Sequence, residues 1–347
     1  MGPLLLLIII LGSLIFIHEL GHFLMAKKAG VHIYEFALGF GPKVWSRVGK
    51  KDKVTYSLRM FPIGGFVQMA GEVYEDDDKI PKSKFMCNKT WLQRITVICA
   101  GVVFNFILAL ILLFIVALGW GYTEQRSYVG SVVDGYPAKE AGIEAGDKII
   151  AVNGKTTNTW DMIILRVMMN KSKSHTFLVK KADGRDITYE MSPVKEKNKD
   201  GQEVEVFGFT SSNKEYKGFT NAIKYAITRF SSIISTMFVT IGGLFSGKIA
   251  LSNLAGPVGM YSIVDQTAKY GLNNVISLMA LLSINLGFIN ILPFPAFDGG
   301  RATFLIIEKI IGRPINKKIE NIMHAVFFVL LMGLMILITI QDILKLF

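Results

Sequence analysis

The chain contains several apolar runs that are long enough to cross a lipid bilayer. A spanning helix needs about 20 consecutive, predominantly apolar residues. Four runs approach this length: Gly2–Ala26, Ile95–Trp120, Val275–Phe297 and Ile322–Ile340, the third broken near its end by two prolines. Of the 347 residues, 51% are hydrophobic and 19% charged, whereas about a quarter of a soluble domain is charged. The sequence therefore predicts a polytopic α-helical membrane protein with about four transmembrane helices.

A fifth stretch, Phe219–Phe245, is long but less apolar. It contains Lys224, Arg229 and several Ser and Thr residues. A helix with one polar and one apolar face lies in the membrane interface rather than across the bilayer. We therefore predict that this stretch forms an amphipathic helix on or beside the membrane.

Basic residues are unevenly distributed between the apolar runs. Segment Met25–Arg94 holds 13 Lys/Arg against 7 Asp/Glu, Gly300–Asn321 adds five basic residues, and Gly121–Gly218 is nearly balanced at 15 against 14. The positive-inside rule assigns basic loops to the cytoplasm. We expect a multi-pass protein of the cell membrane with both termini outside and the balanced segment extracytoplasmic. The net charge of +11 then reflects cytoplasmic loops, so we expect no nucleic-acid partner.

Segment Val54–Ala70 has the pattern of a β-hairpin. Residues 55–60 alternate polar and apolar side chains, Pro62–Gly65 predicts a turn, and residues 66–69 return. One interpretation is a surface hairpin in the cytoplasm. The other is a membrane-reentrant hairpin, because strand edges are tolerated at membrane depth only where protein lines a cavity.

Segment Tyr128–Pro193 reads as one compact mixed β/α domain inserted between the membrane segments. Strands are predicted near 128–133, 148–152, 175–180 and 186–192, with helices near 137–141 and 158–169. The charged stretch Glu196–Glu205 is predicted to be a flexible linker. The predicted organisation is a membrane core over residues 1–121, the inserted domain over 122–195, a linker and amphipathic helix over 196–250, and a second membrane core over 251–347.

Residues 242–248 mimic a phosphate-binding loop, with Gly242, Gly247 and Lys248 at the matching spacing. In such a loop a strand precedes the first Gly, and a Ser or Thr after the Lys holds magnesium. Here Ile249 follows the Lys and the preceding residues do not read as a strand. We therefore expect no nucleotide partner.

The first apolar run carries the pattern H-E-x-x-H at His18, Glu19 and His22. Residues i and i+4 share one face of a helix, so both imidazoles can reach one metal ion. Zinc lowers the pKa of a bound water toward about 7, and a neighbouring carboxylate can take its proton. Burying three ionisable residues in an apolar run is costly unless they are paired or metal-bound, which favours a functional site.

A catalytic zinc site uses three protein ligands, so a third must come from elsewhere. The extended pattern that would supply a third His fails, because Met25 and Lys28 occupy its Gly and His positions. Asp298 follows the Pro293-x-Pro295 break in the third run and is the favoured candidate. The alternative is that Asp298 caps the helix that begins near Gly299, a common role for Asp.

On these residues the chain resembles the site-2 protease family of intramembrane zinc metalloproteases, most closely its bacterial RseP/RasP type. The matching stretches are HELGH at 18–22, GFGP at 39–42, RMFPIGGF at 59–66, GVVFN at 101–105 and NILPFPAFDGG at 290–300. The inserted segment resembles a single PDZ domain through GYPA at 135–138, AGI at 141–143, AGD at 145–147 and VNG at 152–154. Phe297 departs from the family, which usually has Leu before the Asp-Gly pair.

The resemblance implies a Zn²⁺ ion held by His18, His22 and Asp298, with Glu19 as general base. It implies that the hairpin binds an unwound substrate helix through Gly64, Gly65 and Phe66. Asn290, Pro293 and Pro295 are expected to contact substrate near the helix break, whereas Asn105 is expected to bond between helices. The implied substrates are single-span membrane proteins, such as trimmed anti-sigma factors, and remnant signal peptides. The active site would lie within the bilayer, toward the cytoplasm.

Two other functions remain open from the sequence. The chain could be a membrane-anchored zinc protease that cuts soluble or juxtamembrane peptides, with the motif near the water interface. It could also be a non-catalytic PDZ scaffold with a structural metal. Glu19 argues against the scaffold, because a structural zinc site is closed by four protein ligands and needs no base.

Overall fold

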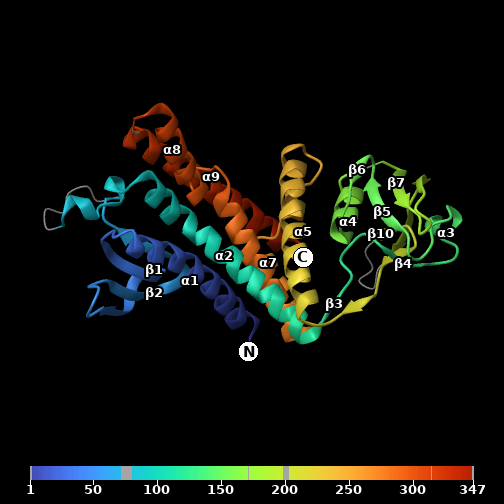
Figure 1. Ribbon diagram of the computed structural model, residues 1–347, viewed down its shortest axis with the longest axis horizontal. Coiled ribbons are helices and arrows are strands. Elements are labelled where there is room, and N and C mark those ends of the chain that lie inside the picture. Colours follow the sequence, from blue (N-terminus) through green and yellow to red (C-terminus); the bar gives the residue numbers. More distant parts are fainter. Residues whose placement is uncertain (1, 72–79, 171, 198–202, 314, 346–347) are drawn as a thin grey trace. The chain divides into compact units, whose positions relative to one another are not determined.

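The computed structural model describes residues 2–71, 80–170, 172–197, 203–313 and 315–345. The chain forms two compact units, one made of residues 1–112 and 254–347 and the other of residues 113–253 (Figure 1). The second unit is therefore an insertion between two parts of the first. Each unit has its own hydrophobic core and is described separately below.

Long apolar helices build the first unit. Its helices are α1 (Pro3–Lys28), α2 (Trp91–Trp120, whose last residues belong to the second unit), α6 (Pro257–Lys269), α7 (Leu272–Ile291), α8 (Asp298–Ile311) and α9 (Lys317–Leu344). Short 3₁₀ turns cover Lys82–Lys84 and Met86–Asn88. Pro3 begins α1, where its missing N–H costs no helical hydrogen bond, and Lys27 and Lys28 sit in the last turn, where a cation is favoured. The N-terminal half of α1 packs on α6 and α7 through Leu14, Val264 and Leu282.

A small sheet covers the other half of α1. Strands β1 (Ile33–Val48) and β2 (Thr55–Met69) form this sheet, and Phe36 and Val67 pack with Phe23 of α1 in one core. The predicted hairpin within Val54–Ala70 is wrong in its pairing, because its two arms do not pair with each other. Ala37 of β1 has Ser57 as one partner and Phe66 as another, so β1 lies between the arms.

The second unit contains the inserted β domain. Strands β6 (Lys155–Thr156), β5 (Lys148–Val152), β7 (His175–Lys180) and β8 (Asp186–Met191) form a four-stranded sheet in that order. Helices α3 (Pro137–Glu140) and α4 (Trp160–Met168) complete the domain, close to the predicted bounds. Its core is formed by fully buried apolar side chains, among them Ile143, Ile149, Phe177 and Val179.

The β domain continues past residue 195. Strand β4 (Val129–Val132) pairs with β11 (Phe209–Ser211), and Phe207 and Phe209 pack in the domain core. The predicted linker is wrong at both of its ends, because β9 (Val194–Lys197) pairs with β10 (Glu203–Val206). Residues 198–202, the middle of that linker, lie outside the described residues.

A short strand pair closes the second unit near its chain ends. Strand β3 (Tyr122–Thr123) pairs with β12 (Glu215–Tyr216), and the rings of Tyr122 and Tyr216 stack with their centroids 5.3 Å apart. Helix α5 (Phe219–Phe245) follows and contacts α4, where Arg229 pairs with Asp161 and the Ser232 hydroxyl donates to Thr159. A 3₁₀ turn at Leu251–Asn253 then leads out of the unit.

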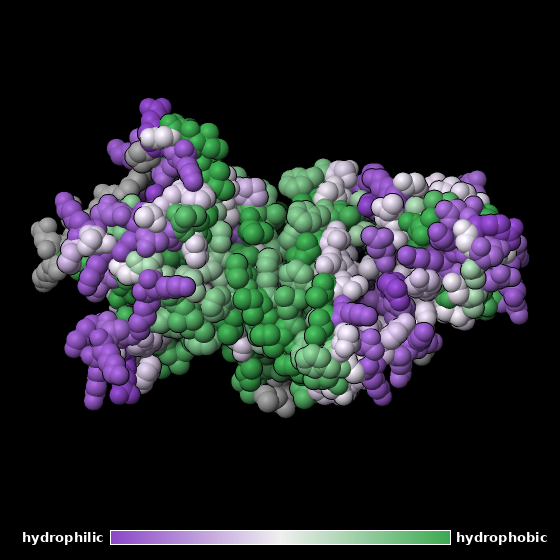
Figure 2. All heavy atoms as spheres, viewed as in Figure 1, coloured by the Kyte–Doolittle hydropathy of each residue, from purple (hydrophilic) through white to green (hydrophobic). Residues whose placement is uncertain are grey.

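Five described helices are long and apolar enough to cross a membrane: α1, α2, α5, α7 and α9. The count exceeds the predicted four because α5, expected to be amphipathic, also meets this criterion, although it is the least apolar of the five. Hydrophobic side chains cover the middle stretch of the first unit's helices, whereas hydrophilic ones gather at one end of that unit and over the visible face of the β domain (Figure 2). These features fit a multi-pass membrane protein with an inserted β domain.

Candidate metal centre

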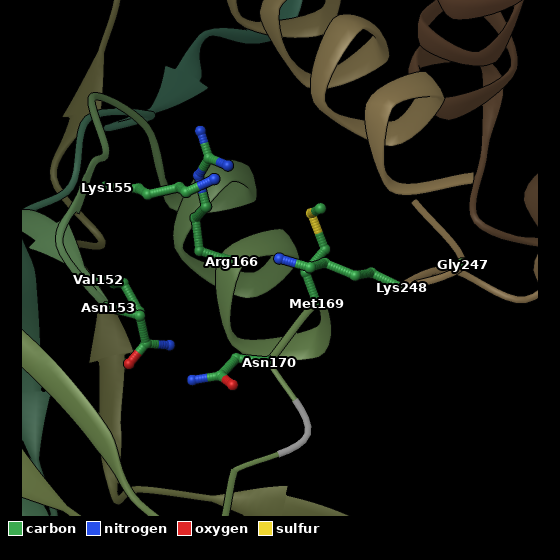
Figure 3. A pocket seen from close by; sticks show the side chains of 8 residues that line it. All are labelled: Val152, Asn153, Lys155, Arg166, Met169, Asn170, Gly247 and Lys248. Carbon is green, nitrogen blue, oxygen red and sulfur yellow. The ribbon is translucent and has the colours of Figure 1, made fainter. Parts of the chain in front are cut away.

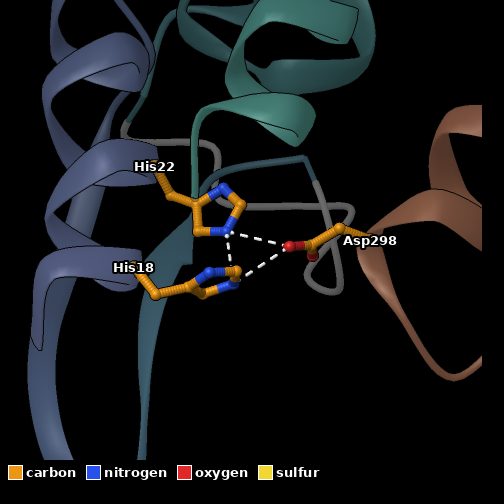
Figure 4. A group of neighbouring side chains, drawn as sticks. All are labelled: His18, His22 and Asp298. Carbon is orange, nitrogen blue, oxygen red and sulfur yellow. Dashed lines mark hydrogen bonds and ion pairs between the residues drawn. The ribbon is translucent and has the colours of Figure 1, made fainter. Parts of the chain in front are cut away.

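Three side chains from α1 and α8 converge in the first unit (Figure 4). The Nε2 atoms of His18 and His22 lie 3.2 Å apart, and Asp298 Oδ2 lies 3.0 Å from the first and 3.2 Å from the second. Within the described part of the chain, these residues are the group of His, Cys, Asp or Glu side chains with metal-binding geometry. The predicted ligand set is thus assembled in space, although its members are 280 residues apart in sequence.

Glycines allow α2 to approach this group closely. A Cβ on Gly101 would collide with the His22 imidazole and lie 2.7 Å from His18 Cε1. A Cβ on Gly21 would lie 2.5 Å from the carbonyl oxygen of Ala100. Helices of membrane bundles use small residues in this way to bring their backbones together. The glycines therefore let α2 supply the groups that orient both imidazoles.

Hydrogen bonds from α2 determine which nitrogen of each imidazole faces Asp298. His22 Nδ1 lies 2.9 Å from the Val97 carbonyl oxygen, which only accepts, so Nδ1 carries the proton. His18 Nδ1 lies 3.1 Å from the Asn105 amide, whose Oδ1 is buried with no partner among the described residues. The oxygen and nitrogen ends of a side-chain amide have the same shape, so the Asn105 amide can be turned by 180°. In that orientation Oδ1 accepts a hydrogen bond from the Nδ1–H group of His18. Both Nε2 atoms then present lone pairs to Asp298.

The arrangement of these three side chains suits a bound cation. Two Nε2 lone pairs face Asp298 Oδ2, which makes no hydrogen bond to any described residue. Ligands of a tetrahedral zinc ion, at 2.0–2.1 Å from the metal, are about 3.3 Å apart. The three observed separations of 3.0–3.2 Å are close to that value. The donor set, two imidazoles and one carboxylate, is also one that zinc prefers.

A break between α7 and α8 brings Asp298 to the imidazoles. Helix α7 ends at Ile291, and the residues before α8 include Pro293 and Pro295, which cannot donate helical hydrogen bonds. Gly300 packs tightly on the break, since a Cβ there would lie 2.6 Å from the Phe294 carbonyl carbon. The capping role considered for Asp298 is not observed, because Phe297 is the N-cap and no side chain caps α8.

A cavity of about 560 Å³ opens beside the triad. Glu19 lines it together with five consecutive residues of β2, Gly65–Met69. Glu19 lies against β2, because a Cβ on Gly65 would be 3.0 Å from Glu19 Cγ. On the other side of Gly65–Met69, β2 pairs with β1, and no described strand pairs along the side that faces the cavity. The cavity therefore presents a strand edge beside the metal ligands.

The other predicted substrate residues are distributed around this cavity. Phe66 lines it, and Asn290 Nδ2 lies 3.5 Å from His18 Nε2. Gly64 is not part of the lining; its φ of +105° and the adjacent Phe40 ring require a glycine there. Pro293 and Pro295 form the helix break and are not part of the lining either.

Some residues of the site were not predicted from the sequence. Asn105 does bond between helices as expected, but its partner is the candidate metal ligand His18. Arg59, Arg301 and His324 line the cavity. Their signal was the rarity of cationic side chains among apolar neighbours, although sequence alone does not show which cavity they share.

Arg59 belongs to an ion-pair cluster that joins β1 to β2. Its guanidinium lies 2.9 Å from Glu35 Oε1 and 4.9 Å from the Phe66 ring centroid, and Lys43 Nζ lies 3.0 Å from Glu35 Oε2. Burial alone would raise the pKa of Glu35, but hydrogen bonds from Ser57, Lys43 and Arg59 outweigh it and lower that pKa. The cluster ties residues 55–59 of β2 to β1, and the other side of β1 pairs with Gly65–Met69, the edge that faces the cavity.

The comparisons with known proteins agree with this geometry. A model of the family described as Peptidase family M50 matches residues 6–334. The Regulator of sigma-W protease RasP of Bacillus subtilis (strain 168) is 32% identical, over 98% of this chain and 98% of the relative. The Zinc metalloprotease RasP of Bacillus licheniformis is also 32% identical with the same coverage. The Putative zinc metalloprotease CPE1693 of Clostridium perfringens is 37% identical over 95% of both chains.

These matches span both parts of the first unit and the insertion between them. They include residues 18–22 and the segment around Asp298, which lie far apart in the sequence and meet in the structure. The relatives are named zinc metalloproteases, in agreement with a donor set suited to Zn²⁺. The chain therefore belongs to peptidase family M50, the site-2 protease family, and is a zinc metalloprotease.

Proposed function

We propose that the chain is an intramembrane endopeptidase that cleaves the transmembrane segments of single-span membrane proteins. One observation carries the proposal: His18, Glu19 and His22 lie on α1, a helix apolar enough to span a bilayer, beside a cavity bordered by a strand edge. Asp298 joins them from the start of α8, directly after the break that ends α7, which is also long and apolar enough to span. His18 is ten residues from the end of α1, or about 15 Å along the helix. That depth supports a site inside the hydrocarbon region, toward the end that carries Lys27 and Lys28.

The chain's own residues have separate roles in this proposal. His18, His22 and Asp298 would hold zinc, which when bound lowers the pKa of a water and polarises the scissile carbonyl. Glu19 takes the proton from the attacking water and returns it to the leaving amine. The amide of Asn290, close to His18 Nε2, is positioned to donate a hydrogen bond to substrate backbone beside the reacting carbonyl.

A substrate helix must unwind before its backbone can react. Carbonyls in a helix are engaged in hydrogen bonds, and in lipid a freed backbone group needs a new partner. The edge Gly65–Met69 supplies such partners, so an unwound segment can add to β2 as a further strand. This favours the reentrant interpretation of residues 54–70 over a surface hairpin, with Gly65 and Phe66 on the edge and Gly64 permitting the backbone turn just before it. Pro293 and Pro295 act indirectly, by breaking the helix ahead of the lining residues Ala296 and Phe297.

The proposed topology has four spans, α1, α2, α7 and α9, in the cell membrane. Helix α5 is proposed to lie at the membrane surface rather than to cross the hydrocarbon region, because Arg229 near its middle pairs with Asp161 of α4 and Ser232 bonds Thr159. An ion pair in mid-helix would be costly in lipid. The β domain is proposed to be a single extracytoplasmic PDZ domain that limits access by bulky substrates.

The proposed substrates are anti-sigma factors already trimmed by another protease, and remnant signal peptides. The name of the Bacillus subtilis relative, a regulator of sigma-W protease, supports the first group. A protease of soluble or juxtamembrane peptides is the remaining alternative. The scaffold alternative is not supported, because three described ligands leave a coordination position open.

The position of the cleaved bonds tests the proposal. The full-length enzyme and its Glu19→Gln variant would be reconstituted in lipid vesicles with a library of single-span substrates, and the products sequenced by mass spectrometry. We expect cuts inside the apolar spans with the wild type and none with the variant. Cuts confined to the soluble flanks, or equal cleavage of the same peptides free in solution, would show that the enzyme acts outside the bilayer.

A further inference from the structure

The second unit contains a basic cavity that has no role in the proposed catalysis. It has a volume of about 460 Å³ and lies between the β5–β6 turn, the end of α4 and the end of α5 (Figure 3). Lys155, Arg166 and Lys248 line it together with the amides of Asn153 and Asn170. Lys248 points from the end of α5 toward α4, so the cations come from three separate elements (Figure 3).

In the described part of the chain, no acidic side chain pairs with the cations of this cavity. Arg166 Nε is buried with no hydrogen-bond partner, and Lys155, Arg166 and Lys248 form no ion pair with any described residue. Burial lowers the pKa of Arg166, and no acidic group acts on it in the opposite direction. A buried donor without a partner destabilises the fold, and more so when it is charged. An anion bound here would relieve that cost.

The helix ends beside the cavity reduce its positive charge but do not cancel it. Helices α4 and α5 end beside the cavity at Met168 and Phe245, and each C-terminus carries about half a negative charge. Together they offset about one of the three positive charges, which leaves about two. That positive excess attracts an anion such as the phosphodiester of a phospholipid, which carries one negative charge and also accepts hydrogen bonds from Arg and amide donors.

Exposed apolar side chains flank the lining residues along the chain. Met168, next to Met169 of the lining, is 62% exposed, and Phe245, two residues before Gly247, is 79% exposed. Leu251, three residues after Lys248, is 48% exposed. A free inorganic anion gains nothing from contact with apolar side chains, whereas the acyl chains of a lipid can cover them.

We propose that this cavity binds the phosphate headgroup of an anionic phospholipid, with the glycerol and acyl chains lying over Phe245 and Leu251. Arg166 and Lys248 hold the phosphate oxygens, and Asn153 and Asn170 bond the remaining headgroup atoms. The segment containing Gly247 and Lys248, which mimics a nucleotide loop, follows a helix rather than a strand. In this proposal Lys248 therefore binds a lipid phosphate rather than a nucleotide.

Native mass spectrometry of the full-length protein in neutral detergent tests this site. The probes are dioctanoyl phosphatidylglycerol, dioctanoyl phosphatidylcholine and inorganic phosphate. We expect one tightly bound phosphatidylglycerol that neither of the other probes displaces at equal concentration. Each of Arg166→Gln and Lys248→Gln should weaken its binding about fivefold, and the double variant about 25-fold, since each charge contributes about 1 kcal/mol.

Lys180→Gln is the matched control, because Lys180 is exposed on β7 and does not line the cavity. It should leave phosphatidylglycerol binding unchanged, and zinc content should be unchanged in every variant. Lys248 is exposed, so its replacement leaves the fold intact even where Arg166→Gln does not. Equal lipid binding by wild type and Lys248→Gln would overturn the proposal. Inorganic phosphate that binds as tightly as the lipid, or a phosphoserine peptide that displaces it, would assign the cavity to a different ligand.

Discussion

At the scale of single residues, each imidazole of the metal centre is oriented through its other nitrogen. The Val97 carbonyl accepts from His22 Nδ1, and the Asn105 amide holds His18 Nδ1. Both contacts come from α2, which contributes no ligand of its own. Such outer hydrogen bonds fix the tautomer and increase the basicity of the ligating nitrogen. We therefore expect the affinity of the site for zinc to depend on α2, a helix that supplies none of the three candidate ligands.

Substitutions of the candidate ligands and of the candidate base are expected to affect zinc content differently. His18→Ala, His22→Ala and Asp298→Ala each remove a ligand, so zinc per chain and cleavage should be lost together. Glu19→Gln removes only the base, so it should retain one zinc per chain while cleavage falls about 10²–10⁴-fold. Zinc is measured by plasma mass spectrometry on the same samples used for rates. Near-normal turnover of Glu19→Gln would exclude Glu19 as the base.

Asn105→Leu is expected to weaken zinc binding about 10–100-fold, because His18 loses the partner of its Nδ1 proton. Asn105→Asp keeps an accepting oxygen there and should retain most of the affinity. The measurement is competition for zinc with a chelator of known affinity. Ser283→Ala is the control, since the Ser283 hydroxyl donates to the Asn105 backbone carbonyl at 2.8 Å and does not touch His18. Similar zinc loss in the Leu and Asp variants would contradict the assigned amide orientation.

The ligands themselves could be predicted from sequence, whereas their supports could not. His18, Glu19, His22 and Asp298 stand out because ionisable groups are rare in apolar runs. Asn105 is also polar in an apolar run, but its partner depends on how closely α2 approaches α1. That approach is set by Gly21 and Gly101, whose role appears only when two helices meet. Periodicity within one helix carries no such information.

At the scale of elements, β2 combines a strand edge with the wall of the catalytic cavity. Gly65 is the contact point, since a Cβ there would lie 3.0 Å from both Glu19 Cγ and the Ala37 carbonyl oxygen. The alternating pattern of residues 55–60 predicted strands correctly. It could not show that β1 separates the two arms of β2, because pairing between distant strands leaves no mark on local alternation.

Gly65→Ala is expected to lower cleavage of membrane substrates about tenfold or more. The added methyl group displaces Glu19 or β2, and small misplacements of catalytic groups have effects of that size. The measurement is the cleavage rate at saturating substrate in vesicles, together with zinc content, which should be unchanged. Gly12→Ala is the matched control, because a Cβ on Gly12 meets no atom within 4 Å. Unaltered rates for Gly65→Ala would mean that β2 does not position the base.

At the scale of the whole molecule, the chain inserts a β domain into a membrane core. The apolar runs could be located from sequence because hydropathy is a local signal, whereas the inserted domain, predicted to end at residue 195, continues through β9–β12. Strand β11 was missed because its partner β4 lies about 80 residues earlier, and a three-residue strand has little pattern of its own. The paired strands β3 and β12 bring the two connections of the domain together.

Those paired strands define where the domain can be removed. Deleting residues 125–213 and joining Glu124 to Lys214 through Asn-Gly should preserve the β3–β12 pair, because their backbones already bond at 3.0 Å. If the domain limits access, the shortened enzyme should keep zinc and cleave trimmed substrates at a similar rate. It should also cut untrimmed substrates, which the complete enzyme excludes. The measurement is the cleaved fraction of both forms of one substrate.

The opposite result has a clear meaning. Loss of trimmed-substrate cleavage with zinc retained would show that the domain docks or activates substrates rather than excluding them. A rejoined chain with β3 and β12 replaced by a flexible linker serves as the comparison. It separates the effect of the missing domain from any disturbance of α2 and α5.

The tight contact between α1 and α2 has a practical consequence for recognising active enzymes among distant sequences. The metal ligands can be present in a chain whose helices stand too far apart for Val97 and Asn105 to reach them. Gly21 and Gly101 are the positions where any larger residue would force that separation. A useful search pattern would therefore require both glycines as strictly as the two histidines. A homologue that keeps HExxH but carries a bulky residue at either position is a candidate pseudoenzyme.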